Sequence, residues 1–227
     1  MIAGMMSIGD DPLSVTMAVK LSQLVDYMVI RYDVLRGRKK DGAGGRWHYE
    51  LLRRTEPFAI PVDHCETEVI HKAGFIWREE MLRRLDPVRP EYVICMDADE
   101  CAGPNFDKSM EWFKASRCDM LLFRYDMITV DGRAVPQTPK VPHCKAFRWV
   151  PGLTFKGAKG FGRPTFPHKP VTEILAKTKM HHYSFFTPEM QEEKLRHYLT
   201  FKKPHEVKQM FTDGGIEAQF EGWYATV

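Results

Sequence analysis

Short apolar segments and amphipathic segments alternate along the first half of the chain. Continuous apolar runs predict buried strands, whereas apolar residues three or four positions apart predict helices. The predicted strands are Met1–Ser7, Val25–Tyr32, Phe58–Val62, Glu91–Met96 and Asp119–Tyr125, and the predicted helices are the stretch from Asp11 to about Leu24, Trp47–Arg54, Ile70–Leu85 and Pro104–Ala115. Strands that alternate with helices are typical of a parallel sheet with helices on its faces. The pattern therefore predicts an α/β fold with a mostly parallel, Rossmann-like central sheet.

The pattern changes after Tyr125. Residues 130–169 are rich in proline, glycine and aromatic residues, which predicts short strands and mobile loops. Two helical patterns follow, at Pro188–Tyr198 and Pro204–Phe211. A chain of 227 residues is long enough for one sizeable core, so we expect a single catalytic domain over residues 1–227. Within it we expect a ligand-binding half, 1–126, and a loop-rich half, 127–227.

The composition is that of an ordinary globular chain. Hydrophobic residues make up 44% of it, and no apolar run approaches the roughly 18–20 residues that span a bilayer. The apolar start, Met1–Ser7, lacks a basic leader and soon meets Asp10 and Asp11, so it predicts a strand rather than a signal peptide. Five cysteines without a CxxC spacing indicate neither a disulfide framework nor a zinc site. We therefore expect a cytoplasmic protein.

One predicted strand ends in a cluster of acids. The apolar segment Tyr92–Met96 is followed at once by Asp97, Ala98, Asp99 and Glu100. Ligands bind at the carboxyl edge of open α/β sheets, and side chains two residues apart in a strand point to the same side. Carboxylates bind hard cations such as Mg²⁺ or Mn²⁺, which complete their coordination with substrate phosphates and water. The motif predicts a divalent-metal site that stabilises a departing diphosphate, with two acids on a surface turn as the alternative interpretation.

Two segments of the sequence match motifs of a known family. Residues 75–82 read Phe-Ile-Trp-Arg-Glu-Glu-Met-Leu and lead through the strand to the acidic cluster at 97–100. Residues 180–185 read Met-His-His-Tyr-Ser-Phe and precede a predicted helix that carries Lys194. Together they resemble the "L-D-A-D-E" region and the late "H-Y/W" segment of family-two-like glycosyltransferases of the GT-A fold. The resemblance covers residues 1–200 in outline, with specific motif content only at 70–100 and 179–194.

The resemblance implies a GT-A-like fold and a metal-dependent transfer of sugar from a nucleoside-diphosphate sugar, with UDP as the expected nucleotide. Residues 1–126 would bind the donor, and residues 127–227 the acceptor. The implied ligands of Mn²⁺ or Mg²⁺ are Asp97, Asp99 and His182, with His181 as the alternative histidine. Asp33 is the one match to the family's aspartate-rich segment after strand two, as a contact to the base or ribose, and Arg78 is a further candidate donor contact. The family's acidic motif near the acceptor is not recognisable, which leaves the base open.

Positive charge is concentrated in residues 139–182. This segment contains nine lysines and arginines and one acid, Glu173, although the whole chain has a net charge of only +3. Within it, residues 147–169 alternate bases with aromatics on a glycine-rich background. Two functions explain this composition: a lid that places Lys159 and Arg163 over the donor diphosphate, or a surface that grips a polyanion. The surplus charge favours a nucleic-acid acceptor, such as hydroxymethylated pyrimidines in DNA, with a solvated basic surface as the alternative.

An inverting transfer needs a carboxylate that removes the proton of the acceptor hydroxyl. Asp126 is the first candidate because it follows the strand Asp119–Tyr125, where the backbone is rigid, although an aspartate here also suits the start of a turn. Glu173, the one acid of the basic segment, is the second candidate. A retaining transfer needs no such base, and the sequence does not distinguish the two mechanisms.

Other classes of protein fit parts of the sequence. A metal-dependent nucleotidyl or phosphoryl transferase also places paired carboxylates at a strand end. A non-enzymatic nucleic-acid-binding module explains residues 139–182 but not the acids at 97–100. A haloacid-dehalogenase-type phosphatase is excluded because the D-x-D stands in the middle of the chain and is followed by Glu100 and Cys101.

Overall fold

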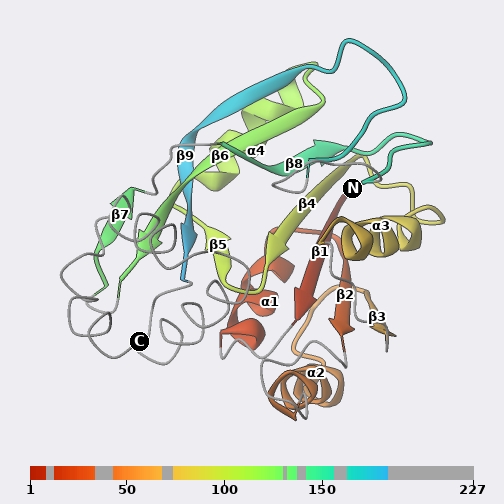
Figure 1. Cartoon of the computed structure of the whole chain (residues 1–227), viewed down its shortest axis with the longest axis vertical. Coiled ribbons are helices and arrows are strands. Elements are labelled where there is room, and N and C mark those ends of the chain that lie inside the picture. Colours follow the sequence, from red (N-terminus) through yellow and green to blue (C-terminus); the bar gives the residue numbers. More distant parts are fainter. Residues whose placement is uncertain are drawn as a thin grey trace, which may run out of the picture.

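A computed structural model shows an α/β protein built on one large, twisted sheet (Figure 1). The structure describes residues 1–8, 13–33, 43–67, 74–129, 132–136, 142–155 and 163–183, without the side chains of 33, 43–47, 67 and 74–76. In this part of the chain the strands are β1 (Ile2–Ile8), β2 (Tyr27–Asp33), β3 (Val62–Thr67), β4 (Tyr92–Asp97), β5 (Glu100–Ala102), β6 (Met120–Ile128), β7 (Ala134–Pro136), β8 (His143–Arg148) and β9 (Glu173–His182). Their order across the sheet is β3-β2-β1-β4-β8-β6-β9-β5, and β7 pairs with β6.

The first half of the sheet is parallel, as the alternation of strands and helices predicts. β1 pairs in parallel with β2 and β4, and β2 with β3. In β4 the five residues Tyr92–Met96 are all buried. A parallel strand that is covered on both faces consists of a continuous apolar run, which explains why this strand was recognisable in the sequence.

Helices cover both faces of the sheet. They are α1 (Ser14–Ser22), α2 (Ala43–Thr55), α3 (Gly74–Arg84) and α4 (Phe106–Ala115). One core contains Ile94 of β4 with residues of α1, α2 and α4, and the other contains the adjacent Val93 with Met81 of α3. Neighbouring residues of a strand point to opposite faces, so the two cores lie on opposite sides of the sheet. No helix in the described residues is long and apolar enough to cross a membrane.

The second half of the sheet mixes parallel and antiparallel pairs. β8 is antiparallel to both β4 and β6, whereas β6 and β9 run parallel side by side (Figure 1). The short β5 pairs antiparallel with the end of β9. The α/β class is therefore confirmed, and the short strands predicted within residues 130–169 are present as β7 and β8.

Several predicted boundaries were wrong. The third strand is Val62–Thr67 instead of Phe58–Val62, and α2 begins at Ala43 instead of Trp47. β9 was not predicted because Lys177, Thr178 and Lys179 interrupt its apolar positions, and β5 is too short for a recognisable pattern. The helices predicted at 188–198 and 204–211 lie outside the described residues.

The topology creates a binding position at one edge of the sheet. From β1 the chain moves to β2 on one side, while β4 lies on the other side of β1, so the strand order reverses between β1 and β4. In open α/β sheets, ligands bind at the carboxyl ends of the strands beside such a reversal. Asp97 is the last residue of β4 and pairs with Ser7 of β1, which places it at this position.

Candidate active site

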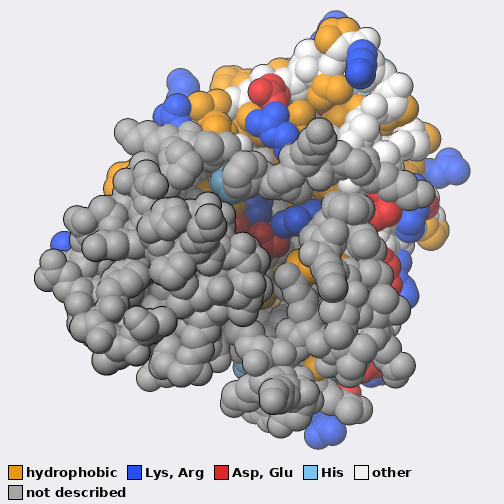
Figure 2. Space-filling model, in the orientation of Figure 1, with side chains coloured by type: hydrophobic (Ala, Val, Ile, Leu, Met, Phe, Trp, Pro, Cys, Tyr) orange, Lys and Arg blue, Asp and Glu red, His pale blue; other side chains and the backbone are white. Residues whose placement is uncertain are grey.

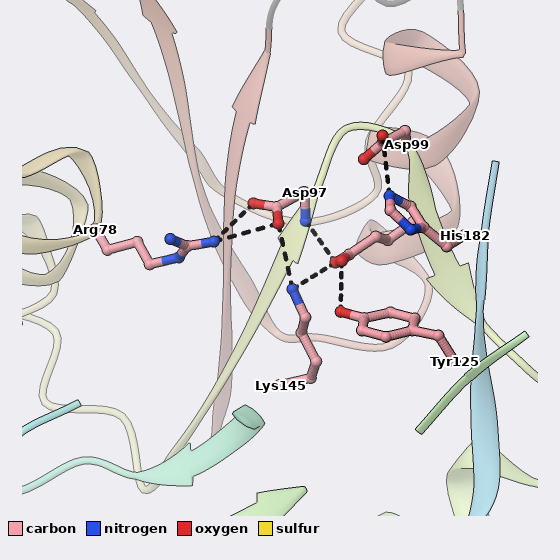
Figure 3. A network of polar contacts seen from close by, with 7 residues as sticks. Arg78, Asp97, Asp99, Tyr125, Lys145 and His182 are labelled. Atoms are coloured by element: carbon pink, nitrogen blue, oxygen red, sulfur yellow. Dashed lines mark hydrogen bonds and ion pairs between the residues drawn. The ribbon is translucent and has the colours of Figure 1, made fainter. Parts of the chain in front are cut away.

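The pairing of β5 with β9 brings the two sequence motifs together. After β4 the chain turns at Ala98 and Asp99 and enters β5 with Glu100, which pairs with His182 of β9. The Asp99 carboxylate Oδ2 lies 3.1 Å from Nε2 of His182, and the Asp99 carbonyl accepts a hydrogen bond from the Tyr183 amide at 2.8 Å. Residues 83 positions apart in the sequence therefore meet at the carboxyl edge of the sheet (Figure 3).

Glu100 fixes the geometry of the acidic turn. Its Oε2 accepts a hydrogen bond from the Asp97 amide at 2.9 Å and lies 2.6 Å from Nζ of Lys145, while its Oε1 accepts a hydrogen bond from the Tyr125 hydroxyl. The Glu100 and Lys145 side chains each retain only 4% of their accessible surface. Because both carboxylate oxygens of Glu100 are engaged inside the protein, this residue holds Asp97 and Asp99 in place.

Asp97 lies between two cations. Nη2 of Arg78 donates to its two carboxylate oxygens at 2.9 and 3.2 Å, and Nζ of Lys145 is 3.4 Å from Oδ2 (Figure 3). Burial alone would raise the pKa of Asp97, but the charges of Lys145 and Arg78 hold this pKa well below its ordinary value. The Asp97 side chain nevertheless keeps 41% of its surface, so one side of an ionised carboxylate is open to a ligand.

Charges of both signs meet in this network. Lys145 stays protonated, because Asp97 and Glu100 raise its pKa well above the ordinary value even though burial acts in the other direction. In the described residues, the carboxylates of Asp97, Asp99 and Glu100 lie beside the cations Arg78 and Lys145 and the imidazole of His182. Such opposite charges stabilise one another where they are shielded from water.

Two donor atoms of this network suit a divalent metal. Asp99 offers a carboxylate oxygen and His182 an imidazole nitrogen, a mixed pair that suits Mn²⁺ better than Mg²⁺. In the described part of the chain no cluster of three or more His, Cys, Asp or Glu side chains is arranged to hold a metal. A metal here would take its remaining ligands from substrate phosphates and water.

Two further side chains complete the buried wall of the site. The His143 ring packs edge-on against the Tyr125 ring, with 4.7 Å between centroids. Burial, reinforced by the positive charge of Lys145, lowers the pKa of His143 to about 4, so its ring is neutral near pH 7. Burial and the neighbouring Glu100 raise the pKa of Tyr125 well above its ordinary value. Tyr125 therefore remains a neutral hydrogen-bond donor to Glu100.

The other predicted donor and metal residues near this edge are placed differently. Asp33 is the last residue of β2 and so lies at the same edge of the sheet as Asp97. His181 precedes His182 in β9, and neighbouring side chains of a strand point to opposite sides. The His182 ring lies against the Asp99 carboxylate, whereas His181 lines a separate pocket together with Asp126. Of the two histidines, His182 is the one that the fold positions beside the acidic turn.

Neither predicted base lies beside Asp99. Asp126 Oδ1 pairs with Nζ of Lys179 at 2.6 Å, and Asp126 follows Tyr125 in β6, so its side chain points away from the network. Glu173 and His182 pair with Met120 and Met127 of β6, which are seven residues apart, so at about 3.3 Å per residue they are separated by about 23 Å. The base of an inverting transfer therefore remains unassigned.

Of the two basic residues predicted to cover the diphosphate, Arg163 lies away from the site. Arg163 Nη1 donates to Glu173 at 2.8 Å, so it lies with Glu173 at the start of β9, far from Asp99. Lys159 lies outside the described residues. That Lys159 covers the diphosphate stays a prediction. The position of Arg163 does not support a lid formed by residues 147–169.

The basic segment is not one continuous surface in the part that the structure describes. Lys145 is buried in the network, and Arg163 pairs with Glu173. Arg148 donates to the Cys118 carbonyl at 2.9 Å and lies over the Tyr92 ring, so it closes the end of α4. Because these charges are used within the protein, the described structure gives no support to a DNA acceptor, which stays a prediction.

Lys145 and Tyr125 are site residues that the sequence reasoning missed. Lys145 stands inside an otherwise apolar stretch, Cys144 to Phe147, where a lone lysine needs a buried partner. That feature could have identified it. Tyr125 gave no comparable signal, because a tyrosine at the end of an apolar strand is ordinary core composition.

In a space-filling view, Lys/Arg and Asp/Glu side chains lie side by side at the bottom of a hollow near the middle of this face (Figure 2). This view agrees with a site in which opposite charges are gathered at the sheet edge. Lys145 and His182 come from residues 127–227 and the acids from residues 1–126, so both halves of the chain build the site.

Comparisons with known proteins complete the description. No protein-family model matches the chain, and no curated protein matches it. Among solved structures, 4-diphosphocytidyl-2C-methyl-D-erythritol synthase from Anaerococcus prevotii is 12% identical with a TM-score of 0.47, covering 88% of this chain and 96% of its own. HddC from Yersinia pseudotuberculosis is 10% identical with a TM-score of 0.47, covering 89% of this chain and 100% of its own.

A third structure is a protein from Bacillus anthracis that is provisionally named glucose-1-phosphate thymidylyltransferase. It is 12% identical with a TM-score of 0.41, covering 99% of this chain and 83% of its own. Two of these three names denote enzymes, a synthase and a thymidylyltransferase. At such low identities, with TM-scores below 0.5, these likenesses identify neither a family nor a reaction for this chain.

Proposed function

We propose that this protein is a metal-dependent glycosyltransferase that uses a nucleoside-diphosphate sugar, with UDP as the nucleotide. The observation that carries the proposal is the contact of Asp99 with His182 beside an Asp97 held between Arg78 and Lys145. A carboxylate, an imidazole and two buried cations, gathered where the strand order reverses, form a suitable set for a metal-bound diphosphate.

In this proposal Asp99 and His182 would hold Mn²⁺ through a carboxylate oxygen and an imidazole nitrogen. The bound metal would offset negative charge on the departing diphosphate. Arg78 and Lys145 keep Asp97 ionised. The open side of Asp97 then accepts hydrogen bonds from hydroxyl groups of the ribose or the sugar. Glu100 and Tyr125 keep the acidic turn in position without contacting the substrate.

Nucleotidyl transfer is the second candidate, since a metal-dependent nucleotidyl transferase also places paired carboxylates at a strand end. Such an enzyme must bind a nucleoside triphosphate, which usually lies against a glycine-rich or basic loop.

The two reactions release different products. The experiment supplies Mn²⁺ with a panel of nucleoside-diphosphate sugars in one series, and with nucleoside triphosphates plus sugar 1-phosphates in the other. Glycosyl transfer, or slow hydrolysis of its donor, releases nucleoside diphosphate in the first series, and the Asp99→Asn variant should lose this release while Glu173→Gln keeps it. Release of pyrophosphate in the second series alone would instead establish nucleotidyl transfer.

A further inference from the structure

A pocket of about 630 Å³ opens between α4 and β9. Its lining includes Lys108, Trp112, Asp126, Lys177, Lys179 and His181. Asp126 and His181 are direct neighbours of Tyr125 and His182 in their strands, so their side chains point away from the acidic network. The pocket is therefore a separate site that the proposed transfer does not use.

The two walls of this pocket are held together at their base. The Thr178 hydroxyl donates a hydrogen bond to the Pro104 carbonyl, which ties β9 to the turn before α4. In the same turn Gly103 lies so close to β9 that a Cβ atom on it would come 2.1 Å from the Lys179 carbonyl oxygen. Only glycine permits this approach, so the pocket has a fixed floor.

An irregularity in β9 directs side chains into the pocket. Leu122 of β6 pairs with Leu175, but Arg124, two residues later, pairs with Lys179, four residues later in β9. β9 therefore carries two extra residues between these pairs. Such bulges bend a strand and redirect its side chains, and they occur often beside binding sites. Lys177 and Thr178, which line the pocket, fall in this bulge.

The lining combines positive charge with an aromatic surface. Lys108, Lys177 and Lys179 face one carboxylate, Asp126, which Lys179 already neutralises at 2.6 Å. The Trp112 side chain retains 42% of its surface, and Met1 is the one other large hydrophobic residue of the described chain that is so exposed. Lysines bind phosphate as point charges, and an exposed indole packs against a flat ring.

We propose that this pocket binds a phosphorylated ring compound, either a sugar phosphate or a nucleoside phosphate. Lys108 and Lys177 hold the phosphate, and Trp112 packs against the sugar or base. The amino-terminal end of α4 begins in the same wall, where the helix dipole adds positive potential. Binding needs neither the metal nor Asp99, so this inference does not depend on the proposed function.

Isothermal titration of the whole chain in EDTA tests the proposal. The probes are adenosine 5′-monophosphate, glucose 1-phosphate, inorganic phosphate, adenosine and glucose. At least one phosphorylated ring compound should bind about tenfold or more tightly than phosphate or either uncharged ring, because charge and stacking each contribute more than about 1 kcal/mol. The tighter of the two phosphorylated probes identifies the nucleoside or the sugar as the natural ring.

Variants test whether the probe binds in this pocket or elsewhere on the protein surface. Trp112→Leu and Lys177→Gln should each weaken binding about fivefold to tenfold. Lys114→Gln, an exposed lysine on the same helix outside the pocket, should leave it unchanged, as should Asp99→Asn. The proposal is overturned if no probe binds in EDTA, if Lys114→Gln weakens binding as much as Lys177→Gln, or if Asp99→Asn abolishes it.

Discussion

The two ends of β9 each carry a pair of ionisable side chains, and the pairs differ in their surroundings. At the end of the strand, His182 and Asp99 retain 20% and 12% of their side-chain surface and adjoin a buried network. At its start, Glu173 and Arg163 retain 44% and 39% and make a single ion pair. The distances are similar, 3.1 and 2.8 Å, so distance alone does not distinguish the two pairs.

The difference lies in what each pair adjoins. Beside Asp99, the side chains of Glu100 and Lys145 are almost completely buried and each has partners on more than one strand. A charge there cannot be solvated, so it is stabilised by its partners or is costly. The Arg163–Glu173 pair is open to water, where an ion pair contributes little. The same strand therefore carries a candidate site beside a buried network at one end and an exposed ion pair at the other.

The largest effect on the free energy of unfolding is expected when the buried network loses Lys145. Lys145→Met leaves Glu100 buried without its ion partner, which should lower the free energy of unfolding by about 3–5 kcal/mol. Urea denaturation measures this loss. The matched control is Lys179→Met in the same sheet, because Lys179 is 41% exposed and the variant should lose about 1 kcal/mol or less. Equal losses in the two variants would contradict the assigned role of Lys145.

The second-largest effect on the free energy of unfolding is expected from protonation of His143 as the pH falls. The unfolded chain binds a proton at this histidine below about pH 6.5, whereas the folded protein does so only below about pH 4. The unfolded state thus binds more protons in this window, so stability is complete above pH 6.5 and is lost as the pH falls toward 4. The loss should be on the order of 2 kcal/mol, since partial exposure reduces the full linkage value.

His143→Gln supplies the control for that pH dependence. Denaturation midpoints of the wild type and the variant are measured from pH 4 to pH 7.5. The stability difference between the two proteins should shrink as the pH falls, because the variant has no proton to bind at this position. A difference that stays constant over the whole range would show that His143 titrates alike in the folded and unfolded states.

The smallest effect is expected at the start of β9. Glu173→Gln removes the exposed partner of Arg163 and should cost less than about 1 kcal/mol of stability, an effect that falls further at 1 M salt. Urea denaturation at low and high salt measures it. A loss of several kcal/mol, or one that salt does not change, would remove the contrast between the two ends of the strand.

Local patterns allowed much of the fold to be predicted. The buried run Tyr92–Met96 and the periodic helix around Met81 carry their own hydrophobic patterns, and both elements were predicted near their observed positions. β9 was missed because six of its ten residues are only partly buried, and β5 because three residues have no period. β5 pairs with the end of β9, and β9 pairs along most of its length with β6, and these are long-range contacts that no local pattern contains.

Long-range contacts also limit how much of the candidate site can be predicted from the sequence. Asp97 and Asp99 were recognisable because charge follows directly on an apolar strand, and His182 because a second motif resembled a known family. The role of Glu100 depends on Tyr125 and Lys145, which reach it from two other strands. Glu173 was chosen for its charge context, but the length of β9 separates it from the acids.

The most direct test of the site is the thermal stability of the protein with UDP and Mn²⁺, added separately and together. We expect marked stabilisation only when both are present, on the order of 2–3 kcal/mol at a hundredfold excess over the dissociation constant. Glu173→Gln should show the same synergy, whereas Asp99→Asn should show none. Synergy that survives in Asp99→Asn, or its absence in the wild type with every nucleoside diphosphate, would contradict the account.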